Sequence, residues 1–177
     1  MSTKRFKAGV VGCGRSGSLF DSDKKRSTIS SHCGAYQNHP KTILRSICDQ
    51  DEIKLLTSSE LWDVEKTYTD YKDMLDKEDL DIVSICTLPD SHLEIAQYAV
   101  ESGVKAIFCE KPISHSLKSA SSIITLCQKK DVHLIINHQR RWSATFRDLR
   151  DRLTSKEFGE IQHINFFYSR GVYNSGS

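Results

Sequence analysis

The 177-residue sequence has little net charge, no strongly basic stretch and no long hydrophobic run. Its formal net charge is +2 and its basic residues are scattered, which argues against a protein that binds nucleic acid or a membrane surface. The apolar run after the N-terminus is short, rich in glycine and unlike a signal peptide, and no later run is long enough to span a bilayer. At 177 residues, the chain is long enough for one well-packed domain and the start of a second.

The sequence also lacks CxxC pairs, and its histidines show no metal-ligand spacing with one another or with cysteine. Three of its six cysteines, Cys48, Cys86 and Cys109, lie within apolar runs. Buried cysteines without a disulfide framework are typical of a reducing compartment. We therefore expect free thiols, no metal site and a cytoplasmic location.

Short apolar runs rich in β-branched residues alternate with segments of helical spacing. Five such runs are predicted to be strands, at residues 7–12, 42–48, 81–87, 104–109 and 132–137. Two of the segments between them carry apolar stripes, formed by Ile95, Ala96, Ala99 and Val100 and by Leu117, Ala120, Ile123, Ile124 and Cys127. This alternation favours an α/β fold, a doubly wound parallel sheet of the Rossmann type with helices on both faces.

The pattern changes near residue 140. Residues 1–140 are predicted to form the Rossmann domain. Residues 141–177 are predicted to start with an amphipathic helix that ends near Gly159 and to continue into a strand over residues 161–171. A lone strand is at best marginal, so we expect this segment to be the connecting helix and first strand of an incomplete C-terminal α/β domain.

Three glycines, spaced as GxGxxG, follow the first predicted strand. In a dinucleotide-binding turn the first glycine makes a tight bend, the second lets the backbone approach the pyrophosphate, and the third lets helix and strand pack closely. The predicted cofactor-binding loop comprises Gly12, Cys13, Gly14, Arg15, Ser16 and Gly17. The motif by itself is weak, and the alternative is a simple turn. Cys13 lies where a helix start would favour a thiolate, unless it is only a small residue that fits.

An acidic residue that binds the adenosine ribose is expected about 20 residues after the loop, at the end of the second strand. Asp49 ends that strand but comes 32 residues after Gly17, so we expect an inserted loop before a main helix at residues 32–39. A carboxylate there accepts hydrogen bonds from ribose hydroxyls and repels a 2'-phosphate, which favours NAD over NADP. NADP stays possible, because Arg45 and the cluster at residues 24–26 offer positive charge. The alternative role for Asp49 is a helix cap.

Further motifs follow the later predicted strands: CTLPDSH with Thr87, Pro89 and His92, CEKPIS with Glu110, Lys111 and Pro112, and an arginine-rich segment after Asn137. Together with the early glycine loop, in this order and over nearly the whole chain, they resemble the N-terminal half of the Gfo/Idh/MocA oxidoreductases. The Glu-Lys-Pro triplet between an apolar strand and a helix is the most specific of these features.

The resemblance implies a Rossmann domain that binds the nicotinamide cofactor and a C-terminal α/β domain that supplies the substrate pocket and homo-oligomer contacts. It implies that Glu110 and Lys111 border the nicotinamide ribose and the reacting carbon, and that Pro112 fixes the turn, often as a cis peptide. Lys111 is the implied catalytic residue, hydrogen-bonding the substrate oxygen or relaying its proton. The other implied cofactor contacts are Thr87, Leu88, Pro89, His92 and Arg140, with Arg141 and Trp142 nearby.

Each of these residues has a structural alternative. His92 could only begin a helix, Lys111 could be an ordinary solvated lysine, and Arg140 and Arg141 could form salt bridges within the fold. The sequence does not decide among these alternatives.

The implied activity is hydride transfer between NAD(P) and a hydroxyl-bearing carbon of a sugar, polyol or related small molecule. Members of the family are usually about twice this length, and their catalytic histidine, commonly with an aspartate, would lie beyond Ser177. We therefore expect dinucleotide binding with little turnover from these residues by themselves. The alternatives are a dinucleotide-binding sensor or regulatory module, and an NAD-dependent glycosidase of the same family.

Overall fold

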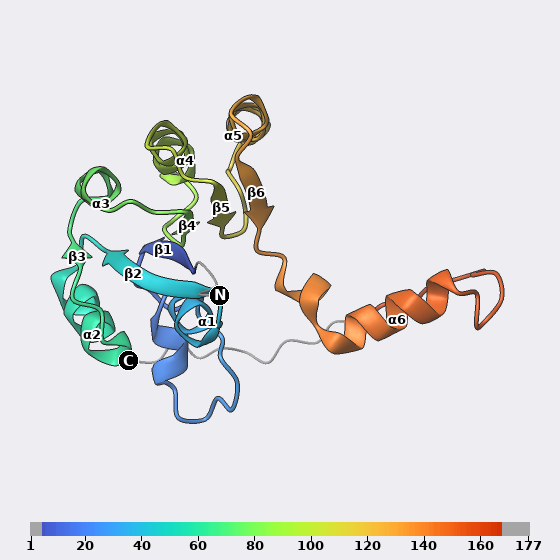
Figure 1. The fold of residues 1–177 in the computed structure, drawn as a ribbon. Coiled ribbons are helices and arrows are strands. Elements are labelled where there is room, and N and C mark those ends of the chain that lie inside the picture. The colour runs from blue at the N-terminus through green and yellow to red at the C-terminus, as the bar shows by residue number, and fades with distance from the viewer. Residues whose placement is uncertain (1–4, 168–177) are drawn as a thin grey trace. The chain divides into compact units, whose positions relative to one another are not determined.

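Six parallel strands form one sheet, in the order β3-β2-β1-β4-β5-β6 (Figure 1). The computed structural model describes residues 5–167, which fall into two units that divide between Asn137 and His138. The sheet belongs to the first unit. Its strands are β1 Phe6–Val11, β2 Thr42–Cys48, β3 Thr67–Tyr68, β4 Ile82–Ile85, β5 Ala106–Cys109 and β6 His133–Ile136. This is the Rossmann order, with its switch point between β1 and β4.

The five predicted strands are confirmed, and their burial explains why the sequence reveals them. In β1, which pairs with both β2 and β4, Ala8, Val10 and Val11 are buried. Strands covered on both faces are apolar at successive positions, which is the pattern that predicts them. Strand β3 is not among the five predicted strands, because two residues are too few to show any pattern.

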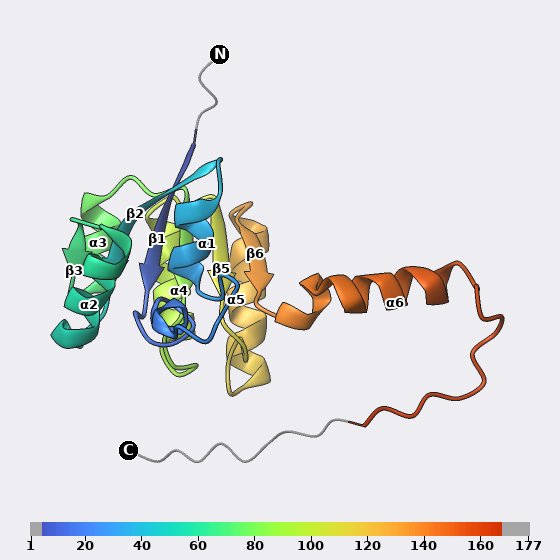
Figure 2. The same cartoon turned by 90° about the horizontal axis from the view of Figure 1, so that it is seen from below.

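Helices cover both faces of the sheet (Figures 1 and 2). One face carries α1 His32–Asn38 and α2 Glu52–Trp62. The other carries α3 Tyr71–Lys77, α4 His92–Glu101 and α5 Leu117–Lys129. Side-chain caps define several of the helix starts; the Ser31 hydroxyl, for example, accepts a hydrogen bond from the Gly34 N–H. The doubly wound architecture predicted from the sequence is confirmed.

The segment between the glycine loop and α1 is an insertion, as the spacing to Asp49 predicts. It contains a short 3₁₀ helix, Leu19–Ser22, and returns to the fold at Ser30 and Ser31. The Asp21 carboxylate closes this loop by accepting hydrogen bonds from the backbone N–H groups of both serines, at 2.7 and 3.1 Å. The main helix α1 follows directly and starts at His32, as predicted for residues 32–39.

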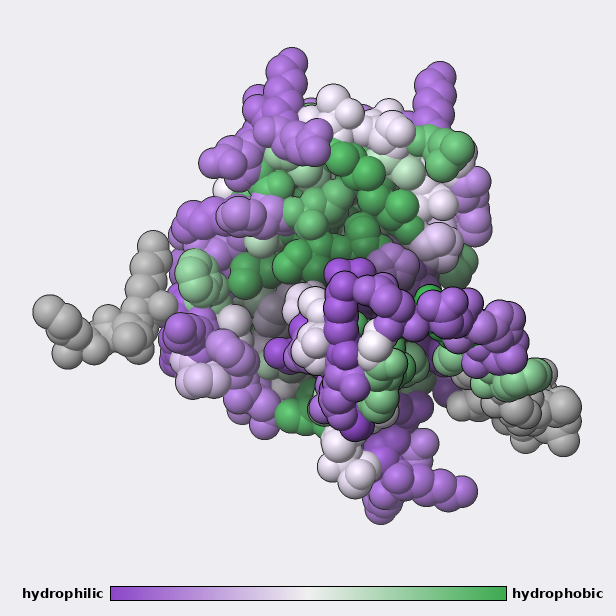
Figure 3. Space-filling model, turned by 90° about the vertical axis from the view of Figure 1, so that its right-hand side faces the viewer, coloured by the Kyte–Doolittle hydropathy of each residue, from purple (hydrophilic) through white to green (hydrophobic). Residues whose placement is uncertain are grey.

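Both segments with predicted helical stripes are helices, but their stripes are buried to different extents. In α4, all four stripe residues are buried. In α5, only Ile123 and Cys127 are buried, whereas Leu117 and Ile124 are exposed. The reason is position: α5 is the last helix of its layer, beside the edge strand β6 (Figure 1). Figure 3, which views the molecule from that side, shows hydrophobic residues at the surface there, and Ile135 of β6 is 45% exposed.

The second unit contains a 3₁₀ helix, Gln139–Trp142, and the helix α6 Ala144–Thr154, which lies within the predicted helical segment. The chain then reaches Gly159 with a left-handed φ of 78°. Residues 161–167 form no strand, which contradicts the predicted strand over its described part, and residues 168–171 lie outside the described residues. A strand needs a hydrogen-bonding neighbour, and this segment pairs with none among residues 5–167. Across the same residues, no helix is long and apolar enough to cross a membrane.

Candidate functional site

The glycine loop lies at the switch point of the sheet, where β1 and β4 end side by side. Gly12 has a φ of 96°, and a Cβ atom there would come within 2.9 Å of the Cys86 carbonyl and the Thr87 nitrogen. A Cβ atom on Gly17 would overlap the carbonyl oxygen of Gly12. The first and third glycines therefore let the turn, its neighbouring loop and the segment that follows pack against one another.

Gly14 differs from the other two glycines, because a Cβ atom there would meet nothing within 4 Å. Within the described part of the chain, the backbone N–H groups of Gly14, Ser16 and Gly17 have no hydrogen-bond acceptor. An open approach beside unpaired backbone N–H groups is the arrangement that receives a phosphate group. The loop residues thus fit a dinucleotide pyrophosphate.

Asp49 directly follows β2 and is tied to the glycine loop. Its Oδ2 atom accepts a hydrogen bond from the Cys13 N–H at 2.7 Å, and its Oδ1 atom accepts one from the Asp51 N–H at 2.9 Å. The cap of α2 is Asp51, whose carboxylate accepts from Ile53 and Lys54, so Asp49 is not the helix cap. These two bonds fix the Asp49 carboxylate at the carboxyl end of β2, beside the turn.

Two of the positive charges that could favour a 2'-phosphate, Arg45 and Arg26, are engaged in other contacts. Arg45 donates through Nε to the buried Glu78 carboxylate at 2.6 Å. In the insertion, the Arg26 guanidinium stacks over the Phe20 ring at 4.4 Å and lies 3.9 Å from Asp23. Asp49 is therefore the charged group that the structure fixes at the carboxyl end of β2.

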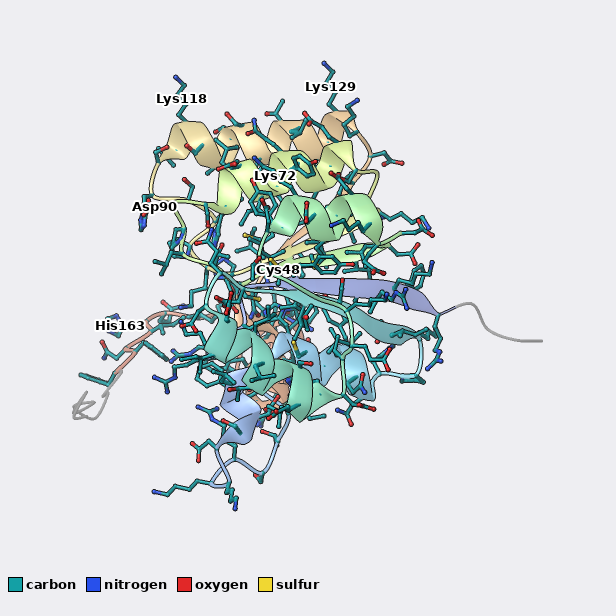
Figure 4. All side chains as sticks on the ribbon, turned by 90° about the vertical axis from the view of Figure 1, so that its left-hand side faces the viewer. Cys48, Lys72, Asp90, Lys118, Lys129 and His163 are labelled. Carbon is teal, nitrogen blue, oxygen red and sulfur yellow. The ribbon has the colours of Figure 1, made fainter. Side chains whose placement is uncertain are left out.

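The Cys13 side chain is buried, which agrees with the alternative that it is a small residue that fits the turn and not a favoured thiolate. Its Sγ atom lies 3.6 Å from the Cys48 carbonyl oxygen, and Cys48 itself lies in the interior at the end of β2 (Figure 4). Burial, followed by the negative charge of Asp49, raises the pKa of Cys13 to about 12. A loop position before a helix favours a thiolate only where water reaches the sulfur. All six cysteines are free, as the sequence predicts.

We predict that native Cys13 resists alkylation by iodoacetamide near pH 8. With a pKa of about 12, only about one molecule in 10,000 carries the thiolate at that pH. Above a pH of about 9 the unfolded chain loses the thiol proton that the folded chain keeps, so the free energy of unfolding falls toward pH 12. Mass spectrometry of native and guanidinium-treated samples measures the difference; fast native labelling would contradict the burial.

The loop after β4 lies next to the glycine loop and carries Thr87, Leu88 and Pro89. The backbone of this loop is held by Ser91, whose hydroxyl donates to the Leu88 carbonyl at 2.9 Å and lies at hydrogen-bonding distance, 2.7 Å, from the Thr87 hydroxyl. Leu88 is 76% exposed. A large exposed apolar side chain beside the glycine loop is available to a flat apolar ligand.

His92 begins α4 and is fully buried. Its Nε2 atom lies 3.2 Å from the Thr87 carbonyl oxygen, and its Nδ1 atom lies 3.2 Å from that of Ile113 and 3.3 Å from the Cys109 sulfur. The ring thus joins the loop after β4 to the loop after β5. These contacts leave neither nitrogen turned toward solvent, and a direct cofactor contact by His92 stays a prediction.

Glu110 and Lys111 follow β5 at the same edge of the sheet, and the Lys111–Pro112 peptide bond is cis. Glu110 is 7% exposed, and Lys111 is exposed. Burial favours a raised pKa for Glu110, but the hydrogen bonds that it accepts, first of all those from His32 and Asn137, hold the pKa below its usual value. The site thus presents an exposed lysine next to a fixed, buried carboxylate.

His32 and Asn137 were missed as site residues. In the sequence, His32 is notable only as one of the histidines without metal-ligand spacing, and Asn137 only as the start of an arginine-rich segment. The Glu110 Oε1 atom accepts from Asn137 Nδ2 at 2.7 Å and lies 3.2 Å from His32 Nε2. His32 is 78 residues from Glu110, so only the strand order brings the two together.

Arg140, Arg141 and Trp142 belong to the second unit, in its 3₁₀ helix. Within that unit, a groove is lined by Arg140, Arg141, Phe146, Arg147 and Arg150. Such a concentration of guanidinium groups suits an anion. Contact between Arg140 and a cofactor stays a prediction.

The comparisons with known proteins agree with this geometry. A family model described as an oxidoreductase family with an NAD-binding Rossmann fold matches residues 6–138. The D-apiose dehydrogenase of Paraburkholderia graminis is 31% identical over 154 residues, covering 85% of this chain and 38% of that protein. The myo-inositol 2-dehydrogenase of Thermotoga maritima is 28% identical over 155 residues, covering 88% and 42%. The chain spans about two fifths of the length of these curated relatives.

A solved structure shows the same fold. The scyllo-inositol dehydrogenase of Lactobacillus casei, with bound cofactor NAD(H) and scyllo-inositol, matches with a TM-score of 0.76 and 21% identity. The match covers 89% of this chain and 43% of that one. At this identity the likeness shows the fold alone.

Proposed function

The chain belongs to the Gfo/Idh/MocA oxidoreductase family, and we propose that it binds NAD(H) at the carboxyl edge of its sheet as the cofactor-binding part of a sugar or polyol dehydrogenase. When bound, the nicotinamide ring exchanges a hydride with a hydroxyl-bearing carbon of the substrate. The supporting observation is the open space at Gly14 beside the unpaired N–H groups of Gly14, Ser16 and Gly17. That space suits a pyrophosphate and has no role in packing the turn.

Asp49 would accept hydrogen bonds from the adenosine ribose hydroxyls. Each carboxylate oxygen has more than one lone pair, so the bonds from the Cys13 and Asp51 N–H groups leave acceptor capacity. The same negative charge would repel a 2'-phosphate, and Arg45 is paired with Glu78. We therefore propose a preference for NAD(H) over NADP(H).

Lys111 would act on the substrate. Its ammonium group can donate a hydrogen bond to the oxygen at the reacting carbon and stabilise the charge that develops there. The exposure of Lys111 beside the buried Glu110 supports this role, since a substrate can reach the amine while the residue before it is fixed. Thr87, Leu88 and Pro89 would line the neighbouring wall.

The proposed substrate class is a sugar or cyclic polyol. It rests on the relatives named as D-apiose dehydrogenase and myo-inositol 2-dehydrogenase. Many hydroxyl groups on one small molecule also suit a site in which one exposed lysine must select a single oxygen. The longest form of the protein that its gene encodes is the suitable sample for assays with D-apiose, myo-inositol and scyllo-inositol.

Calorimetric titration of the chain with NADH and, in parallel, NADPH tests the proposal. We expect one NADH to bind per chain, about tenfold or more tightly than NADPH, because the proposed ribose contact with Asp49 would bring a 2'-phosphate close to a like charge. Binding of neither nucleotide by a folded sample would contradict the proposed function. Equal binding of both would contradict the role of Asp49 only.

The variant Asp49→Ser separates the two effects of this carboxylate. Losing the bond to the Cys13 N–H weakens both nucleotides, whereas losing the charge helps NADPH only. The ratio of the two dissociation constants should therefore move toward NADPH by about tenfold. Asp51→Ser is the matched control: serine still caps α2, one negative charge is lost two residues away, and the ratio should not change.

A further inference from the structure

Five buried polar side chains form one connected network next to Lys111. They come from four separate elements of the first unit: His32 and Tyr36 lie on α1, Ser84 on β4, and Glu110 and Asn137 directly follow β5 and β6. Each is at most 8% exposed. Among the five, only Glu110 was expected to lie at the cofactor; Asn137 marks the start of the arginine-rich segment, and the other three belong to no motif.

The distances make the network continuous. The Tyr36 hydroxyl lies 2.8 Å from the Ser84 hydroxyl, which lies 2.8 Å from His32 Nδ1. His32 Nε2 lies 3.2 Å from Glu110 Oε1. One arrangement of hydrogens satisfies this chain: Tyr36 donates to Ser84, Ser84 donates to Nδ1, and the Nε2–H group donates to the carboxylate.

The network ends on the backbone of the proposed catalytic residue. Glu110 Oε1 is held by His32 and by Asn137, which donates at 2.7 Å. The other oxygen, Oε2, accepts the backbone N–H of Lys111 at 3.3 Å. The Glu110 carboxylate is therefore clamped on one side by two side chains and bonds to the amide of Lys111 on the other.

We propose, building on the proposed function, that His32 and Asn137 are positioning residues: they fix the Glu110 carboxylate, and through its bond to the Lys111 amide they set the direction in which the Lys111 side chain leaves the sheet. A network that served folding only would be costly. A buried carboxylate is unfavourable unless it is paired, and apolar side chains of similar volume often give equal or greater stability. The contacts from His32 and Asn137 through Glu110 to the Lys111 N–H group give this unfavourable burial a role in placing Lys111.

Two substitutions of the same histidine separate positioning from folding. The amide nitrogen of His32→Gln can reach the place of Nε2 and still donate to Glu110. The shorter His32→Asn reaches only the place of Nδ1, so it keeps a bond to Ser84 and loses the one to Glu110. Tyr36→Phe is the matched control, because it removes a buried hydroxyl from the far end of the network and leaves the Glu110 partners in place.

Amide hydrogen exchange, measured by NMR on the 177-residue chain, is the first readout. In His32→Asn, exchange at the Lys111 amide should rise about tenfold, while the Cys86 amide, which bonds to the Val11 carbonyl at 2.7 Å, should not change. His32→Gln should restore most of the protection at Lys111. Tyr36→Phe should leave it unchanged.

Polyol oxidation by the longest encoded form of the protein is the second readout. His32→Asn should lower kcat by about 100-fold, because a small misplacement of a reacting group is enough for that effect, while the NADH dissociation constant stays within about threefold. His32→Gln should recover most of kcat. Equal losses in all three variants, or faster exchange at Lys111 with unchanged kcat, would overturn the inference.

The readouts also separate failure of this inference from failure of the proposed function. If the unaltered protein neither binds NADH nor oxidises these polyols, the proposed function is wrong, and exchange at Lys111 decides whether the network positions this turn. If the unaltered protein is active and His32→Asn exchanges at Lys111 like the unaltered chain, only the inference is wrong.

Discussion

Replacing Gly17 by alanine should destabilise the fold, whereas replacing Gly14 by alanine should leave the fold intact and weaken NADH binding. The two glycines belong to one motif and lie three residues apart. Their surroundings differ: a Cβ atom on Gly17 would overlap the Gly12 carbonyl oxygen, and one on Gly14 would meet open space. The pair therefore separates a glycine required for packing from a glycine required for the ligand.

For Gly17→Ala we expect the free energy of unfolding to fall by about 3 kcal/mol, because the overlapping atom is backbone and cannot rotate away. The Gly12 carbonyl is held in turn, since the N–H group of Gly12 bonds to the Cys48 carbonyl at 2.7 Å. Urea unfolding followed by circular dichroism measures the loss. A variant as stable as the unaltered chain would contradict the close packing of the turn.

For Gly14→Ala we expect the free energy of unfolding to change by less than about 1 kcal/mol, since alanine meets no neighbour and restricts the unfolded chain. NADH affinity should fall by about 10- to 100-fold, because the methyl group occupies the approach to the unpaired N–H groups and prevents charge-assisted hydrogen bonds. Calorimetry on the folded variant measures this. Unchanged affinity would show that the pyrophosphate does not lie at Gly14.

The sequence predicts those parts of the fold in which the position of a segment in the sheet also determines its local pattern of apolar residues. Strand β1 is covered on both faces, so its successive positions are buried and its sequence is a continuous apolar run. The distance from Gly17 to Asp49 predicts the insertion, because the position of Asp49 at the end of β2 does not change when residues are added before α1. The stripe of α5 correctly predicts a helix, but the exposure of Leu117 and Ile124 depends on what lies beside β6, and no local pattern predicts that.

What the sequence leaves open or misses at the site has the same origin. The position of Cys13 between a strand and a turn allows either a thiolate or a small buried residue, and only the residues around it, which bury the sulfur and raise its pKa, decide between the two. His32 meets Glu110 because α1 packs on one face of the sheet and Glu110 follows β5 at the carboxyl edge of that sheet (Figure 1). A contact over 78 residues has no sequence signature without an alignment or a structure.

The carboxyl edge of the sheet connects these observations. The glycine loop, Asp49, the loop at Thr87 and the Glu110–Lys111 turn follow β1, β2, β4 and β5, and all of these strands are parallel. A parallel sheet puts all four segments at one edge, where doubly wound folds bind their ligands. The Gly14 and Asp49 substitutions test whether the nucleotide binds at this edge, and a substitution of Lys111 tests whether the reaction takes place there.

Lys111→Met should abolish most of the dehydrogenase activity while leaving NADH binding nearly unchanged. Methionine keeps an unbranched side chain of similar length but cannot donate a hydrogen bond to the substrate oxygen or stabilise its charge. We expect kcat to fall by about 100- to 10,000-fold in the longest encoded form of the protein. The NADH dissociation constant should stay within about threefold, because the pyrophosphate and ribose contacts proposed for residues 12–17 and Asp49 are untouched.

Lys118→Met is the matched control for this substitution. Lys118 lies on α5 and points away from the fold (Figure 4), so its loss removes the same charge from the same unit without touching the site. Unchanged kcat in Lys118→Met together with a large loss in Lys111→Met assigns the effect to the position and not to net charge. If Lys111→Met kept full activity, Lys111 would be an ordinary solvated lysine, and the proton of the substrate hydroxyl would have to be taken by another group.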